Sequence, residues 1–279
     1  MATDFDFFDH LAQTDDMKIK YLFFDCDNTL VLSEDVASEV CCDLINDILK
    51  IKGCAVRFSS EKLISDFVGL NFRRIMAILQ QQYGFQLSQT ELKTYIRIQE
   101  ERVITNIRAK TKPCPGVRAV LARLSRLGVD MAVVSSSSLC RIRACLETTG
   151  LLEFFDDNKI FSAADSLPVP SSKPDPAIYL HALEKLGAPA SACLTVEDSM
   201  SGARAALGAN LKCLGYVGST HTYGKRIEMA TYLRNAGCVE IMWHWGNYGR
   251  HLSTVEAQEK DEAERLRLLQ STEGATKRA

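Results

Sequence analysis

The strongest constraint on the fold is an alternation of short apolar segments with helical segments. Short apolar segments that end in polar or turn residues predict buried strands, here over residues 19–24, 129–134, 159–162, 192–196, 211–216 and 239–243. Helical patterns lie between most of them, over residues 117–127, 139–149, 176–186 and 199–208. Strands that alternate with helices predict an α/β fold whose parallel sheet is covered on both faces.

The stretch between the first strand and this alternation has a different pattern. Residues 33–112 contain no convincing strand, and their apolar residues recur every three or four positions, as on the buried side of a helix. Three such stripes are Val36/Val40/Leu44/Ile48, Phe72/Ile75/Met76/Leu79 and Leu92/Tyr95/Ile96/Val103/Ile107. We therefore expect a helical domain at residues 33–112, inserted into a sheet domain of residues 1–32 and 113–251.

Residues 252–279 form a polar, charged segment at the C-terminus. Glu256 and Lys260 are four residues apart, as are Asp261 and Arg265, which is the spacing of ion pairs on a helix surface. We expect this tail to be an exposed helix that frays into a disordered end and that the fold does not need.

Composition and charge exclude several classes of protein. The formal net charge of -2 argues against binding to nucleic acid or to an anionic membrane. No segment approaches the ~18 apolar residues needed to span a bilayer, and the acidic start at residues 1–6 is unlike a signal peptide. The ten cysteines form no C-x-x-C pair and the five histidines are scattered, so we do not expect zinc. A cytoplasmic protein is expected, with its oligomeric state left open.

Polar residues follow several of the predicted strands, at the edge where open parallel sheets bind ligands. Asp25 and Asp27 follow the first strand, and residues two apart in an extended chain point to the same side. Ser135 follows the second strand, and Glu197 and Asp198 follow the fourth. These side chains are therefore expected to share one site.

The acidic residues of this site imply a metal ion. Like charges a few ångströms apart do not all stay ionised unless a cation lies among them. Oxygen ligands of this kind suit Mg²⁺, which also bridges to phosphate. Lys173, in a loop stiffened by two prolines, gives a phosphate group a positive partner, and Ser135 adds a hydroxyl. The residues predict a magnesium site beside a phosphate site.

These motifs resemble, in their order, those of the haloacid dehalogenase superfamily. They are the Asp-Cys-Asp-Asn-Thr-Leu run at residues 25–30, Ser135, Lys173, and Glu197-Asp198-Ser199 followed by Gly202. The helical insertion resembles the cap of the subgroup that includes beta-phosphoglucomutase and many sugar-phosphate phosphatases. The resemblance implies a Rossmann-like sheet core with an inserted all-helical cap, and a Mg²⁺-dependent reaction of a small phosphorylated metabolite.

The resemblance also implies a role for each motif residue. Asp25 is the nucleophile that forms an aspartyl-phosphate. Asp27 is the general acid and then the general base, and its backbone carbonyl reaches the metal. The implied phosphate-binding residues are Thr29, Ser135 and Lys173. The implied metal ligands are Asp25, Asp27, Glu197 and Asp198, with Glu197 acting directly or through water.

Two further details of the motifs lead to expectations. Asn28 stands where the family often has Gly, but Asn also tolerates a left-handed backbone, so we expect the turn to survive. Ser137 and Ser138, at the end of a run of four serines, are interpreted as loop filler.

Residues 67–74 resemble the loop with which the family's caps select their substrates. Asn71, Arg73 or Arg74 is expected to contact the substrate. The alternative is an ordinary helix start with solvated arginines. The cap itself is expected to close over the site and exclude water.

Four functions are open, of which we favour a phosphatase acting on a sugar or polyol phosphate. An isomerase that moves phosphate within a sugar is the second, but such mutases carry a His where this chain has Ala37. Dehalogenases of the family lack the second aspartate, present here as Asp27. The intact set of acids argues against a non-catalytic regulatory or binding protein.

Overall fold

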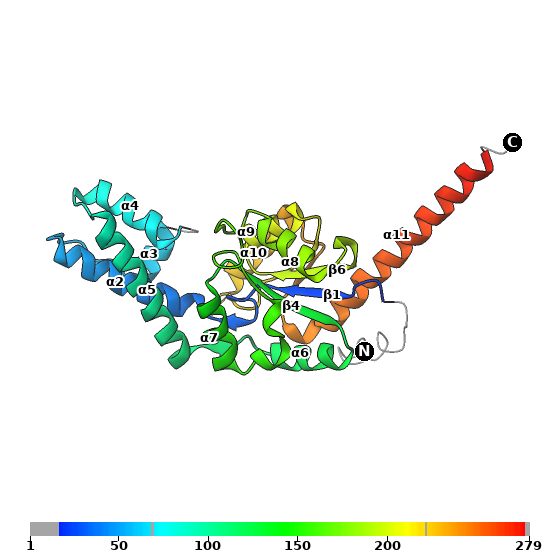
Figure 1. The fold of residues 1–279 in the computed structure, drawn as a ribbon, viewed down its shortest axis with the longest axis horizontal. Coiled ribbons are helices and arrows are strands. Elements are labelled where there is room, and N and C mark those ends of the chain that lie inside the picture. The colour runs from blue at the N-terminus through cyan, green and yellow to red at the C-terminus, as the bar shows by residue number, and fades with distance from the viewer. Residues whose placement is uncertain (1–16, 68–69, 221, 277–279) are drawn as a thin grey trace. The chain divides into compact units, whose positions relative to one another are not determined.

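The computed structural model describes residues 17–67, 70–220 and 222–276 (Figure 1). The chain divides into two compact units. We call them the sheet unit, which comprises Met1–Leu30, Pro113–Leu139 and Leu151–Ala279, and the helical unit, which comprises Val31–Lys112 and Cys140–Gly150. Within the described ranges, no helix has both the length and the apolar character needed to cross a membrane.

The sheet unit is built on six parallel strands in the order β5-β4-β1-β6-β7-β8. The strands are β1 (Tyr21–Phe24), β4 (Asp130–Ser135), β5 (Ile160–Ser162), β6 (Cys193–Glu197), β7 (Lys212–Tyr216) and β8 (Glu240–Met242). The predicted α/β fold and its parallel sheet are confirmed, with each strand within two residues of its expected bounds. Since Phe24 pairs with both Val133 and Val196, the polar residues that follow β1, β4 and β6 meet at one edge.

Helices cover both faces of this sheet, as Figure 1 shows. One face carries α8 (Ala177–Leu186), α9 (Met200–Gly208) and α10 (Tyr223–Ala236), which enclose a core rich in alanine. The other carries α6 (Val117–Arg126), the short helix η4 (Trp245–Asn247) and the start of α11 (Tyr248–Thr276). Three short helices complete this unit, η1 (Leu152–Phe154), η2 (Asp157–Lys159) and η3 (Ala190–Ala192). The sequence did not reveal α10, because its apolar residues are spread around the helix. Ala230 and Leu233 are buried, whereas Ile227 and Tyr232 are exposed.

A cluster of aromatic rings supports the loop that follows β1. Phe24, Tyr216 and Tyr248 all pack against Trp245, with ring centroids 5.5–5.9 Å apart. The buried indole of Trp245 donates a hydrogen bond of 3.1 Å from Nε1 to the backbone carbonyl of Thr29. Aromatic packing of this kind adds about 0.5–1.5 kcal/mol per pair beyond area burial. The rings therefore fix the path of the chain just beyond its first motif.

The helical unit contains α2 (Glu34–Ile51), α3 (Ser60–Asp66), α4 (Phe72–Tyr83) and α5 (Gln89–Lys110), together with all but the first residue of α7 (Leu139–Thr149). The three expected apolar stripes lie on α2, α4 and α5, and most of their residues belong to one hydrophobic cluster. Ser88 forms a capping box with Glu91 that begins α5, and Gly84 ends α4 in a left-handed conformation. Two strands too short to show any alternation, β2 (Val31–Leu32) and β3 (Lys112–Pro113), pair with each other.

The expectation of an exposed tail is wrong for the first turns beyond residue 251. Leu252 and Val255 on α11 are fully buried, and Glu256 is only 3% exposed. The Glu256 carboxylate accepts hydrogen bonds from the backbone N–H groups of Lys18, at 2.9 Å, and Ile19, at 2.6 Å. The charge that suggested a solvent-facing surface instead holds the chain just before β1.

We therefore predict that a chain ending at His251 is less stable by at least about 3 kcal/mol. Burying one such apolar side chain contributes about 1.5–3 kcal/mol, and a hydrogen bond to a charged group about 1.5–3 kcal/mol. Urea unfolding measures the loss. A chain ending at Asp261, which keeps Leu252, Val255 and Glu256, is the matched control and should match the full chain. Equal stability of the two truncated chains would contradict the docking of α11.

Candidate active site

Lys173 lies at the centre of the polar residues that the sheet brings together. Its Nζ donates hydrogen bonds to Asp25 Oδ1 at 2.8 Å, to Glu197 Oε1 at 2.6 Å and to the carbonyl of Val134 at 2.7 Å. The Lys173 side chain is only 4% exposed. Burial favours the neutral amine, but the two carboxylates outweigh this and hold the pKa of Lys173 above its usual value. The ammonium group is therefore charged and fixed in place.

The two carboxylates beside Lys173 are themselves buried. Burial raises the pKa of Asp25, Lys173 opposes that shift and nearby Asp27 adds to it. Burial likewise raises the pKa of Glu197, with Lys173 again opposing it. Both acids are poised to gain from any further positive charge that binds next to them.

Glu197 is held on one oxygen and open on the other. Its Oε1 accepts hydrogen bonds from Lys173 and from the hydroxyl of Tyr179, a fully buried residue of α8. Its Oε2 is buried and has no hydrogen-bond partner among the described residues. A Cβ atom at residue 202 would lie 1.8 Å from Oε2, so only Gly202 fits there at the start of α9. Ser199 caps this helix, because its hydroxyl oxygen accepts the N–H of Gly202 at 3.0 Å.

Three carboxylates form a group that fits a metal ion. One oxygen each from Asp25, Glu197 and Asp198 lies within 4.8 Å of the others. All three donors are hard oxygen atoms, and Glu197 Oε2 has no hydrogen-bond partner among the described residues. The donor set therefore fits Mg²⁺ rather than a soft metal. The expected fourth carboxylate, that of Asp27, is not in the group.

Asp27 is directed instead towards the loop after β4. Its Oδ2 accepts a hydrogen bond of 2.6 Å from the hydroxyl of Ser137. Asn28, the next residue, has a φ of 55°, which confirms that Asn supplies the left-handed turn here. The turn redirects the chain between Asp25 and Thr29, so the strand geometry that aligned Asp25 with Asp27 does not extend to both side chains.

The serines after β4 are organised more closely than the sequence suggested. Ser135 is buried, and its Oγ accepts the N–H of Ser137 at 3.1 Å. The Oγ of Ser136 accepts the backbone N–H of Lys173 at 3.1 Å. The interpretation of Ser137 as loop filler is therefore wrong, because its hydroxyl binds Asp27. The run of four serines was the signal, but nothing in it identified which hydroxyl reaches which partner.

Thr29 lies inside the loop that the aromatic cluster supports. The residue is fully buried, and its carbonyl is bound by Trp245. Its Oγ1 has no hydrogen-bond partner in the part of the chain that the structure describes. A buried hydroxyl without a partner costs about 1–3 kcal/mol, so this position is suited to a polar ligand group.

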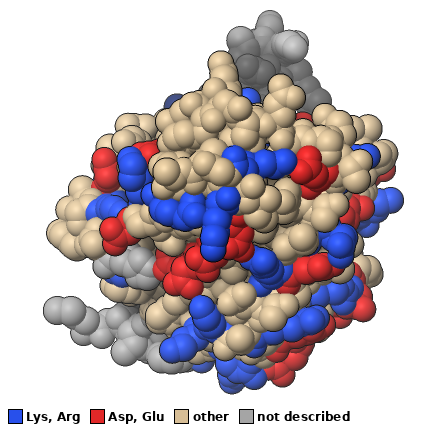
Figure 2. Space-filling view, turned by 90° about the vertical axis from the view of Figure 1, so that its left-hand side faces the viewer, with Lys and Arg blue, Asp and Glu red and all other residues tan. Residues whose placement is uncertain are grey.

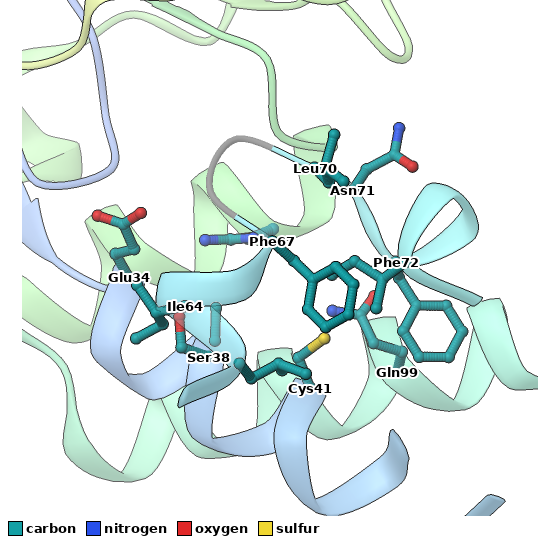
Figure 3. A pocket seen from close by; sticks show the side chains of 13 residues that line it. Glu34, Ser38, Cys41, Ile64, Phe67, Leu70, Asn71, Phe72 and Gln99 are labelled. Atoms are coloured by element: carbon teal, nitrogen blue, oxygen red, sulfur yellow. The ribbon is translucent and has the colours of Figure 1, made fainter. Parts of the chain in front are cut away.

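The helical unit has a pocket of its own, of about 370 Å³ (Figure 3). Its labelled lining residues are Glu34, Ser38, Cys41, Ile64, Phe67, Leu70, Asn71, Phe72 and Gln99. Asn71 caps α4, because its side-chain oxygen accepts the N–H of Arg74 at 3.0 Å. Arg73 and Arg74 are exposed and do not line the pocket.

Basic and acidic side chains are interspersed on the face shown in Figure 2.

Comparisons with known proteins agree with the motifs. A model of the haloacid dehalogenase-like hydrolases matches residues 19–210. The chain is 26% identical to 6-phosphogluconate phosphatase of Escherichia coli over 204 residues, which cover 73% of this chain and 85% of that protein.

Solved structures share the fold. The haloacid dehalogenase-like protein ATU0790 of Agrobacterium tumefaciens has a TM-score of 0.67 and 26% identity, covering 85% of this chain and 99% of that one. A mutant of CbbY from Rhodobacter sphaeroides, in complex with xylulose-(1,5)bisphosphate, has a TM-score of 0.62 and 23% identity, covering 82% and 95%. Because the family model covers residues 19–210, a range that contains all four motifs, the chain belongs to the haloacid dehalogenase-like hydrolase family.

Proposed function

We propose that this protein is a Mg²⁺-dependent phosphatase that hydrolyses a small sugar or polyol phosphate through an aspartyl-phosphate on Asp25. The observation that carries the proposal is the buried contact of Lys173 with Asp25 and Glu197, next to the three-carboxylate group. It supports a nucleophile at Asp25, with a fixed positive charge and a metal-binding set beside it at one edge of the sheet. A phosphate dianion is the substrate group that such a site stabilises.

In the proposed first step, an oxygen of Asp25 attacks phosphorus and the bond from phosphorus to the leaving oxygen breaks. Asp27 gives its proton to that leaving oxygen. In the second step water attacks phosphorus, Asp27 takes a proton from it, and the electron pair of the broken bond returns to the Asp25 carboxylate. Lys173 and Ser135 hold the phosphoryl oxygens, and Thr29 steadies the loop between the two aspartates and β2.

The metal is proposed to bind at the carboxylate group. Asp25 and Asp198 would hold it through their side chains, Asp27 through its backbone carbonyl, and Glu197 through Oε2, directly or by way of water. Bound there, Mg²⁺ supplies positive charge that offsets the negative charge of the carboxylates and of the phosphoryl group. Its binding would also give Glu197 Oε2 the partner that it lacks.

The choice of substrate class rests on the relatives. A 6-phosphogluconate phosphatase is similar in sequence, and a CbbY protein solved with xylulose-(1,5)bisphosphate is similar in fold. The two compounds in these names, 6-phosphogluconate and xylulose-(1,5)bisphosphate, are both phosphorylated sugar derivatives. The helical unit is proposed to be the cap that selects among them, with Asn71, Arg73 or Arg74 at the substrate. The helix-capping bond of Asn71 supports the alternative that these residues only begin α4.

An Asp25→Asn variant tests the nucleophile. The amide keeps the shape but cannot attack phosphorus, so turnover should fall to the uncatalysed background. The fold should survive, because Glu197 and the Val134 carbonyl remain as partners of Lys173. Phosphate release and circular dichroism are measured together, with Asp156→Asn, an exposed carboxylate of the sheet unit, as control. Substantial turnover by a folded Asp25→Asn variant would contradict the proposed mechanism.

Metal removal tests the cofactor. Dialysis against a chelator should abolish phosphate release from p-nitrophenyl phosphate, and added Mg²⁺ should restore it. Ca²⁺ should restore little, because its longer bonds and looser geometry do not hold the reacting groups in line. Undiminished activity after exhaustive chelation would contradict the assignment of the carboxylate group.

Hydrolase and isomerase differ in the group that accepts the phosphoryl from Asp25. Ala37, which lines the pocket of the helical unit, has no side-chain proton to exchange, so it cannot couple cap closure to phosphoryl transfer as the His of the mutases does. We predict one orthophosphate for each substrate consumed when hexose phosphates, beta-glucose 1-phosphate among them, are followed by phosphorus NMR. A new sugar-phosphate resonance that grows without orthophosphate would favour the isomerase.

A further inference from the structure

The hydroxyl of Ser137 lies 2.6 Å from Oδ2 of Asp27 and donates a hydrogen bond to it. We propose that Ser137 is a positioning residue, which orients the Asp27 carboxylate for its two proton transfers. The inference rests on the proposed function, since it concerns the residue that acts there as acid and base. It adds a second residue on which those transfers depend, taken from a loop that the sequence left without a role.

Ser137 is itself held from both sides. Its backbone N–H donates to Ser135 Oγ at 3.1 Å, and its carbonyl accepts the hydroxyl of Ser162 at 2.7 Å. Ser162 is fully buried at the end of β5, and its Oγ accepts the N–H of Asp165 at 3.0 Å. Hydrogen bonds from two neighbouring strands, β4 and β5, therefore hold the backbone of Ser137 on both sides. The hydroxyl that meets Asp27 projects from this fixed backbone.

The hydrogen bond from Ser137 limits how the Asp27 carboxylate can turn. If the carboxylate rotated about its last bond, Oδ2 would lose this hydrogen bond. When the carboxylate is charged, the Ser137 O–H stabilises it as a donor. A general acid must lie within hydrogen-bond reach of the atom it protonates, and small misplacements of a catalytic group reduce the rate steeply.

The competing role for Ser137 is direct binding of a substrate phosphate oxygen. The two roles make different kinetic predictions. Loss of a binding contact raises KM and leaves kcat almost unchanged, whereas loss of an aligned acid and base lowers kcat. Loss of alignment also has no further effect once the carboxylic acid is gone.

A double-mutant cycle of Ser137 and Asp27, assayed with p-nitrophenyl phosphate and Mg²⁺, distinguishes the positioning role of Ser137 from the binding role. Ser137→Ala should lower kcat by about 10- to 50-fold, part of the 10²–10⁴ that acid–base catalysis supplies, with KM within about twofold. Ser137→Thr, which keeps the hydroxyl, should recover most of the loss. In an Asp27→Asn background, Ser137→Ala should change kcat by less than about twofold, because the two residues act as one unit.

Ser125→Ala, which removes an exposed hydroxyl on α6 of the same unit, is the control and should stay within about twofold of the unmodified chain. Circular dichroism checks that each variant is folded. If Ser137→Ala lowers kcat as much in the Asp27→Asn background as in the unmodified chain, Ser137 does not act by orienting Asp27. A rise in KM at unchanged kcat would overturn the proposal as well. Neither result touches the proposed function, whose failure would instead appear as no phosphate release by the unmodified chain.

Discussion

A lysine ammonium group is buried at the carboxyl edge of the sheet, and the surrounding residues keep it charged. Taking an ion out of water costs several kcal/mol even after the protein relaxes, unless partners of opposite charge and good geometry compensate. Lys173 has two such partners and a backbone carbonyl, each within 2.8 Å. They come from β1, β4 and β6, so the parallel register of three strands is what makes this compensation possible.

Close packing around the same cluster fixes the orientation of its acids. Tyr179 reaches Glu197 from α8, and its ring also lies 5.1 Å from the Lys173 ammonium. At the other carboxylate oxygen of Glu197, Oε2, α9 approaches so closely that residue 202 must be glycine. Glu197 therefore cannot turn away from Lys173, and Oε2 is presented without a protein partner among the described residues. An arrangement of oxygen atoms of this kind suits a hard cation.

Local patterns predicted the features that depend on local structure. The strands and the residues that end them were visible because apolar runs and polar ends lie next to each other in sequence, and the left-handed turn at Asn28 followed from the chemistry of that side chain. Contacts between distant segments left no such trace. The partner of Asp27 is 110 residues away, and Tyr179 looked like any apolar residue of a helix. The sequence around Glu256 is compatible with a surface ion pair to Lys260 and equally with the buried contact that Glu256 makes with Ile19.

That contact between α11 and the chain before β1 also bears on the order of folding. Glu256 is separated by 237 residues from Ile19, whose N–H it binds, although β1 lies at the centre of the sheet. Closing so long a loop carries an entropic cost that the earlier contacts must first offset. On a growing polypeptide, β1 can pair with β4 and then β6 well before its N-terminal flank is anchored. Of the six strands, the central strand β1 is synthesised first. The residues just before it, Lys18 and Ile19, can bind Glu256 only after every other strand of the sheet has been synthesised.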